Sequence, residues 1–93
     1  MRRAAKVDVN QAEIVKALRK IGATVQPLHT VGHGCPDLLV GFQGENHLFE
    51  VKDGSLPASR RILTEDEAKW ANNWRGTVRV IKSVDEAIEA ITL

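Results

Sequence analysis

The sequence predicts a single α/β domain in which helices flank a mixed sheet, with elements in the order α-β-β-β-α-β-α. Three segments place apolar residues at helical spacing, and four others have the alternation or the β-branched content of strands. The chain has 93 residues, 43% of them apolar, which allows one thin core and leaves little room for a second. We expect residues 1–93 to form one domain, with residues 1–8 as a mobile basic arm.

The first helix is expected to begin near Asn10 and to end at Gly22. Asn10 and Glu13 have the spacing of a capping box, in which two side chains satisfy backbone N–H groups at the helix start. Residues 23–29 are the first strand candidate, and Pro27 places that strand at a sheet edge or at a bulge.

Residues 36–42 and 47–52 are predicted to form a hairpin of two apolar strands. We expect Gly44 and Glu45 to be the two central residues of its turn. The polar segment that follows, residues 53–60, is predicted to be a mobile loop.

The second half of the chain contains two helix starts and one strand. Thr64 and Glu67 have the pattern of another capping box, so a helix is expected to follow them. Residues 77–81 alternate as a strand should, and Ser83 with Glu86 is expected to cap the last helix. The buried stripe of that helix is predicted to be Val84, Ala87, Ile88 and Ile91.

Three charged residues, Asp37, Glu50 and Lys52, lie within the predicted hairpin. Side chains alternate across a strand, so Glu50 and Lys52 share a face. With Gly44 and Glu45 in the turn, Asp37 faces Lys52 and lies diagonal to Glu50, a separation that side chains bridge. A slip of one residue would move Asp37 to the opposite face, so the grouping depends on register.

Two carboxylates at one strand edge repel each other unless a cation neutralises them. Oxygen ligands suit Mg²⁺ or Mn²⁺, and Mg²⁺ binds one or two carboxylates while keeping several waters. Next to a phosphodiester, such an ion polarises the phosphoryl oxygen and activates a bound water, while a nearby lysine offsets developing charge. The alternative is a cross-strand cluster of salt bridges on a solvent-facing side of the sheet.

Pro36-Asp37 followed by Glu50-Val51-Lys52 resembles the motif of the PD-(D/E)xK nucleases, and the order of elements resembles their core. The chain is most similar to the small stand-alone VRR-NUC nucleases of phages. The segment GCPDLLV (34–40) resembles their G-x-P-D strand entry, LFEVKDG (48–54) their E-V-K strand, and LTEDEAKW (63–70) the helix that follows.

This resemblance implies metal-dependent hydrolysis of DNA phosphodiester bonds, with Mg²⁺ or Mn²⁺ as cofactor. Asp37, Glu50 and the backbone carbonyl of Val51 would bind the metal, and Lys52 would be the catalytic lysine. The family also places a glutamate near the metal from the first helix, and Glu13 matches it. For Glu13 the role of a helix-cap partner stays open.

The chain departs from the family pattern at Glu67, where relatives usually carry glutamine. A carboxylate at that position would bind the metal directly, bind it through water, or only cap its helix. The candidate DNA contacts are basic residues and a glycine that allows close approach of a strand: Arg2, Arg3, Lys6, Gly34, Arg60 and Arg61. The alternative for the arginines is simple solvation.

Trp70 and Trp74 lie one turn apart on the predicted second helix and are expected to pack in the core, with stacking on an unpaired base as the alternative. A zinc site would need four nitrogen or sulfur ligands, and the candidates are His29, His33, Cys35 and His47. A nucleophilic Cys35 would need a neighbouring base, which the sequence does not indicate.

The function that the sequence favours is a Mg²⁺- or Mn²⁺-dependent endodeoxyribonuclease, with branched or four-way junction DNA as one candidate substrate class. The competing functions are a nucleic-acid-binding module with little or no catalytic activity and a hydrolase of other phosphate esters. We expect a homodimer and no small-molecule cofactor. The basic N-terminal residues are followed by no apolar run, which predicts a cytoplasmic protein without a membrane span.

Overall fold

The computed structural model describes residues 8–60 and 62–93. It has three helices, α1 (Gln11–Lys20), α2 (Glu65–Asn73) and α3 (Val84–Thr92), and four strands, β1 (Thr24–Pro27), β2 (Leu38–Phe42), β3 (Glu45–Val51) and β4 (Val78–Ile81). A short 3₁₀ turn, η1 (Ala58–Arg60), interrupts the polar loop after β3. The predicted order of helices and strands is confirmed. No helix within the described residues is long and apolar enough to cross a membrane.

The four strands form one mixed sheet in the order β1-β2-β3-β4. Strand β2 pairs antiparallel with β1 and with β3, whereas β4 pairs parallel with β3. A parallel pair needs a long crossover, and the chain between β3 and β4 supplies it with η1 and α2. The last residues of β3 therefore lie between β2 and β4 at the centre of the sheet.

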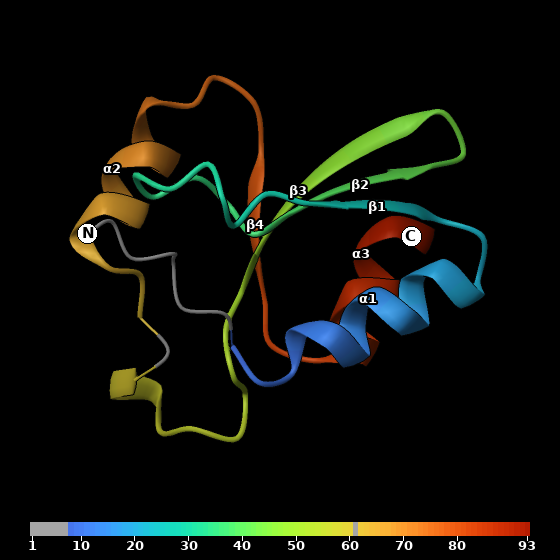
Figure 1. Cartoon of the computed structure of the whole chain (residues 1–93), viewed down its shortest axis with the longest axis horizontal. Helices are drawn as coiled ribbons and strands as arrows, with labels where there is room; N and C mark the ends of the chain where they lie inside the picture. Colours follow the sequence, from blue (N-terminus) through green and yellow to red (C-terminus); the bar gives the residue numbers. More distant parts are fainter. Residues whose placement is uncertain (1–7, 61) are drawn as a thin grey trace.

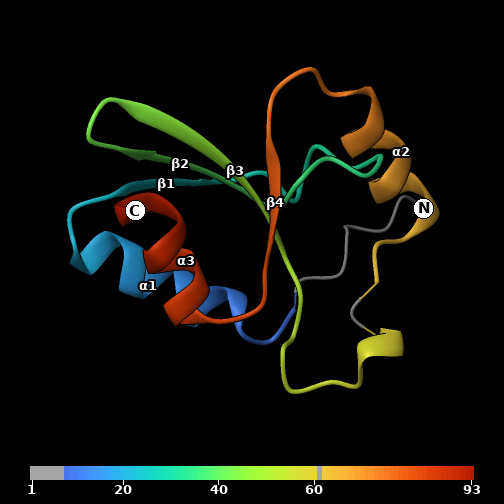
Figure 2. The same cartoon turned by 180° about the vertical axis from the view of Figure 1, so that it is seen from behind.

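Helices α1 and α3 pack side by side against one face of the sheet, and the core lies between them and the strands (Figure 1). The buried apolar residues are Ile14, Leu18, Ala23, Leu38, Val40, Phe49, Val51, Ile81, Ala87 and Ile91. Helix α2 lies at the far end of the molecule from α1 and α3, as the view from behind also shows (Figure 2). The prediction that helices flank the sheet is therefore correct for one face, while the opposite face leaves Leu39 37% exposed.

The hairpin turn consists of Gln43 and Gly44, not of Gly44 and Glu45 as predicted from the sequence. Both residues have positive φ, 51° and 81°, which is the conformation of a type I′ turn. Phe42 pairs with Glu45 in consequence, and the register of the whole hairpin is displaced by two residues from the expected one. Because the displacement is even, every side chain stays on its predicted face.

The starts of α2 and α3 follow the sequence prediction. Thr64 and Glu67 form a complete capping box at α2. The Ser83 hydroxyl accepts a hydrogen bond from the N–H of Glu86 at α3, with 3.1 Å between Oγ and N.

The capping box predicted at α1 is wrong. Asn10 precedes the helix in a helical backbone conformation, and its side chain makes no cap hydrogen bond. The Asn10 amide instead donates to the carbonyl oxygens of Lys52 and Lys82, at 3.0 and 3.1 Å. A single side chain thereby joins the ends of β3 and β4, which lie distant from it in the sequence.

The two tryptophans do not pack in the core, contrary to the prediction. None of the residues of α2 is buried, and Trp74, which follows the helix, is 48% exposed. The indole rings of Trp70 and Trp74 stack on each other with their centroids 4.7 Å apart.

Candidate active site

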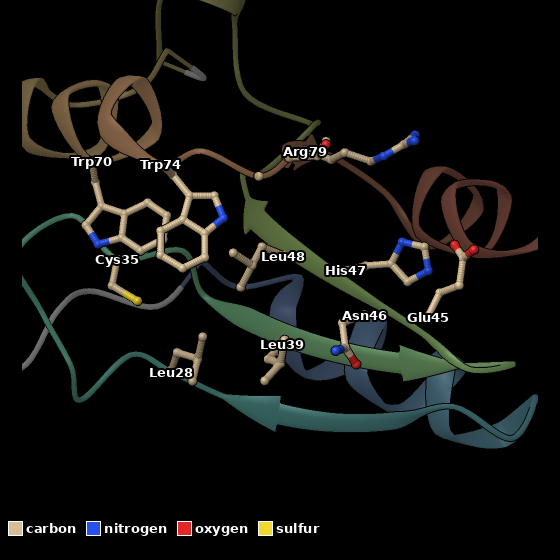
Figure 3. Close-up of a pocket in the computed structure, with 12 residues that line it drawn as sticks. Leu28, Cys35, Leu39, Glu45, Asn46, His47, Leu48, Trp70, Trp74 and Arg79 are labelled. Carbon is tan, nitrogen blue, oxygen red and sulfur yellow. The ribbon is translucent and has the colours of Figure 1, made fainter.

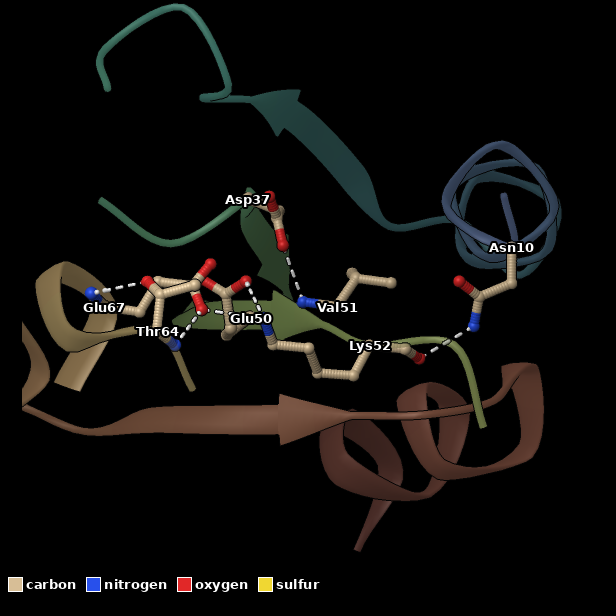
Figure 4. A network of polar contacts seen from close by, with 7 residues as sticks. All are labelled: Asn10, Asp37, Glu50, Val51, Lys52, Thr64 and Glu67. Carbon is tan, nitrogen blue, oxygen red and sulfur yellow. Dashed lines mark hydrogen bonds and ion pairs between the residues drawn. The ribbon is translucent and has the colours of Figure 1, made fainter. Parts of the chain in front are cut away.

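Asp37 and Glu50 meet on the face of the sheet opposite α1 and α3. Asp37 immediately precedes β2, and its N–H donates to the carbonyl of Phe49 at 2.9 Å. Its side-chain Oδ2 accepts from the N–H of Val51 at 2.7 Å (Figure 4). Hydrogen bonds to Phe49 and Val51, the neighbours of Glu50 in the chain, fix Asp37 directly opposite Glu50. The register predicted from the sequence placed Asp37 opposite Lys52.

The carboxyl group of Glu50 is buried, with only 3% of the residue exposed. Burial raises the pKa of Glu50 to about 10, and a hydrogen bond with Asp37 and the charges of Asp37 and Glu67 act in the same direction. At neutral pH this raised pKa favours the protonated form of Glu50, which forms a hydrogen bond with the carboxyl group of Asp37. A cation bound beside the two carboxyl groups would favour the ionised form of Glu50 and so oppose this shift.

Lys52 reaches the same face and is held there by Glu67. The Lys52 ammonium lies 2.7 Å from Glu67 Oε1 and 3.8 Å from Glu50 Oε2 (Figure 4). Burial lowers the pKa of Lys52, but the hydrogen bond and charge of Glu67 outweigh burial, so the pKa is raised overall. The closer ion pair of Lys52 is therefore the one with Glu67.

Glu67 combines the helix-cap role that the sequence predicted with a contact that it did not predict. Its Oε1 accepts the N–H of Thr64 at 2.8 Å as well as the ammonium of Lys52. Burial raises the pKa of Glu67, but the bonds from Lys52 and Thr64 outweigh it and lower the pKa overall. Capping therefore aims this carboxylate at the site.

Asp8 is a site neighbour that the sequence analysis missed. The pKa of Asp8 is raised overall, mainly because the side chain is partly buried. The charge of Lys52 lowers it and the charge of Asp37 raises it, so Asp8 lies within electrostatic range of both residues. Glu13, the residue that the family resemblance selected, is exposed on α1 and lines a different hollow, beside Lys82. The structure thus does not bring Glu13 together with Asp37.

Removal of the negative charge of Asp8 and removal of that of Glu13 are expected to have different effects on Mg²⁺ binding. If the site binds Mg²⁺, Asp8→Asn should weaken that binding severalfold, because one negative charge beside the site is lost. Glu13→Gln should leave the affinity unchanged, because its side chain is exposed elsewhere. Calorimetric titration of both variants with Mg²⁺ makes the comparison, and weaker binding by Glu13→Gln alone would reverse the two assignments.

The oxygen atoms at the site fit a hard divalent cation. The N–H of Val51 points toward Asp37, and the carbonyl of a strand residue points to the same side as its N–H. Two carboxylates and this carbonyl are the donors that Mg²⁺ or Mn²⁺ takes, with water in its other positions. Among residues 8–60 and 62–93, no three His, Cys, Asp or Glu side chains are arranged as a ready set of metal ligands. A site of two carboxylates and one carbonyl does not require a third side chain.

The other candidate residues have different surroundings. Gly34 has φ of +83°, and a Cβ there would clash with the backbone of Asp66, so the loop before β2 needs glycine to pack against α2.

Burial raises the pKa of the Cys35 thiol, which is the opposite of nucleophile activation. The backbone of Arg60 ends η1. The remaining candidate DNA contacts, Arg2, Arg3, Lys6 and Arg61, lie outside the described residues.

No protein-family model, curated protein or solved structure matches this chain.

Proposed function

We propose that the protein is a Mg²⁺- or Mn²⁺-dependent deoxyribonuclease of the PD-(D/E)xK type, related to the small VRR-NUC nucleases. The observation that carries the proposal is the direct contact of two carboxyl groups, Asp37 and Glu50, beside Lys52 at the centre of the sheet. These are the residues of the sequence motif: Asp37 immediately precedes β2, Glu50 lies in β3, and Lys52 immediately follows β3.

The burial of Glu50 favours a functional site over a surface cluster of salt bridges. Exposed ion pairs gain little free energy, and they leave each charge hydrated. Here Glu50 is 3% exposed, and its carboxyl group forms a hydrogen bond with another carboxyl group, that of Asp37. Such an arrangement costs stability in the metal-free protein, and strongly perturbed carboxyl groups concentrate at functional sites.

Each residue of the site has a role in the proposed reaction. Asp37, Glu50 and the Val51 carbonyl hold the cation, which when bound polarises the scissile phosphate and lowers the pKa of a coordinated water. Lys52 orients the attacking water and offsets negative charge that develops on the phosphoryl oxygens. Glu67 positions the Lys52 ammonium through their 2.7 Å ion pair.

That same ion pair supports a second candidate function, a nucleic-acid-binding module with little or no catalytic activity. A lysine held at 2.7 Å by Glu67 is partly neutralised before substrate arrives. The two functions are separated by incubating the protein with linear, flapped and four-way junction DNAs, with and without Mg²⁺ or Mn²⁺. Metal-dependent cleavage of any substrate supports the nuclease, whereas binding without cleavage under every condition supports the module.

We also expect the protein to act as a homodimer, because one site hydrolyses one strand and a two-fold axis would pair two sites for coordinated cuts. The chain of 10.3 kDa is small, and dimerisation would bury apolar surface that a thin core leaves exposed. Sedimentation at micromolar concentration should give twice the chain mass. A mass of one chain that persists with metal and DNA bound would contradict the dimer.

A further inference from the structure

A groove of about 620 Å³ adjoins the candidate active site on the uncovered face of the sheet. The stacked indoles of Trp70 and Trp74 form one wall, and Leu39 and Leu48 from neighbouring strands form the floor (Figure 3). The charged residues at its rim, Arg79 and Glu45, carry opposite signs. The recognition chemistry of the groove is therefore aromatic and apolar.

The tryptophan wall does not serve to hold the core together. Trp74 is 48% exposed, and the core on the other side of the sheet is complete without any residue of α2. The orientation of Trp74 is nevertheless constrained, because a Cβ at Gly76 would come within 2.8 Å of the indole Nε1. The backbone at Gly76 thus lies close to the indole of Trp74, which remains partly exposed beside the groove.

The groove continues directly from the carboxylate pair. Leu39 lies two residues after Asp37 and Leu48 two residues before Glu50, and each pair shares one face of its strand. Two residues of strand span about 7 Å, which is about two nucleotide steps of a stacked strand. A strand with its scissile phosphate at the carboxylates would bring neighbouring bases over this floor.

We propose that the groove binds unpaired bases of a DNA strand next to the scissile phosphate, so that the substrate class is DNA with a single-stranded segment. The inference rests on the proposed nuclease function. Bases within a duplex are stacked on each other and have no free face, whereas an unpaired base stacks on an indole. An uninterrupted duplex would contact only Asp37, Glu50 and Lys52, and would leave the groove empty.

The two tryptophans of the chain both line the groove, so intrinsic fluorescence reports on it alone. The probes are a blunt duplex, the same duplex with a thymidine tail, and the same duplex with an abasic tail that keeps the phosphates. Binding is measured in EDTA, without divalent metal and hence without cleavage. We expect the thymidine tail to quench the fluorescence strongly, and the abasic tail and blunt duplex to quench it little.

Substitution of Trp74 then tests the wall itself, with affinities taken from the anisotropy of labelled DNA. Trp74→Ala should weaken binding of the thymidine-tailed DNA roughly tenfold and leave the abasic-tailed DNA unchanged. Trp74→Phe should restore most of the loss, because phenylalanine keeps an aromatic face. The matched control is Ile62→Ala, which removes an exposed apolar side chain outside the groove and should change neither affinity.

Equal affinity of Trp74→Ala and wild type for the thymidine tail would overturn the inference, as would equal quenching by the thymidine and abasic tails. Loss of a dimer in Trp74→Ala, seen by sedimentation, would also overturn it, because the groove would then bind a second copy of the chain. Quenching by the thymidine tail without cleavage under any metal condition would uphold the base-binding groove and refute the nuclease.

Discussion

Asp37→Asn and Glu50→Gln are each expected to lower metal-dependent DNA cleavage by several orders of magnitude while the protein remains folded. Each change removes a charged metal ligand and keeps the shape of the side chain. The fold should persist because both groups lie outside the apolar core, and because an amide of the same shape can keep a hydrogen bond between the two side chains. Cleavage is measured with saturating DNA over a range of Mg²⁺ and Mn²⁺ concentrations, and folding by circular dichroism.

The matched control is Glu89→Gln, which neutralises an exposed carboxylate on α3 far from the site and should cleave at the wild-type rate. Lys52→Ala should also be inactive, but its binding of metal should survive because the carboxylates remain. Wild-type turnover by purified Asp37→Asn would refute the metal site.

The stability of the metal-free protein is expected to fall as pH rises from about 4.5 toward 10. The pKa of Glu50 is raised from 4.5 to about 10 on folding, so the folded protein binds one proton more than the unfolded chain within this window. Stability from this group is therefore complete below pH 4.5 and is lost progressively as pH rises, at up to about 1.4 kcal/mol per unit. Glu67 has the opposite shift, and its contribution is lost only as pH falls toward and below its lowered pKa.

Thermal or urea unfolding in EDTA across this pH range measures the effect, and Glu50→Gln should remove most of the slope. Divalent cation should reverse the trend, because the metal binds the deprotonated carboxylate and its stabilisation grows with pH. The same metal should leave the stability of Glu50→Gln nearly unchanged. A flat pH profile for the wild type in EDTA would show that Glu50 is ionised in the folded protein.

The order of elements and the caps of α2 and α3 followed from the sequence because they depend on local patterns. The caps at Thr64 and Ser83 involve residues three positions apart, and each apolar stripe repeats within one element. Asn10 has the same local pattern as Thr64. Its amide is used elsewhere because the ends of β3 and β4 present two carbonyl groups to it, and no local pattern records that proximity.

The register of the hairpin shows a different limit. Displacing the strands by two residues keeps Leu38, Val40 and Phe49 on the core face, so the apolar pattern fits both registers equally. Only the turn decides between them, and Gln43 adopts a positive φ that its residue type does not signal. Asp37 and Glu50 are still grouped as predicted, because the grouping requires only that both side chains lie on the same face of the sheet.

The remaining parts of the site involve contacts between distant segments. Glu67 meets Lys52 across the crossover between β3 and β4, and Asp8 approaches from the chain before α1. The family resemblance indicated Glu13, which lies on α1, the first helix, but on an exposed side of it. Such contacts are set by the packing of whole elements, which the spacing of residues within one element does not specify.

Because α2 is weakly anchored, we expect it to exchange between a docked and an undocked position. The helix carries Glu67 and Trp70 but buries no residue, so little apolar free energy favours its docked position over an undocked one. Only molecules with α2 docked have Lys52 positioned and the groove closed on its tryptophan side. The apparent affinity for substrate is therefore the intrinsic affinity reduced by the docked fraction, and a substrate that contacts the helix raises that fraction as it binds.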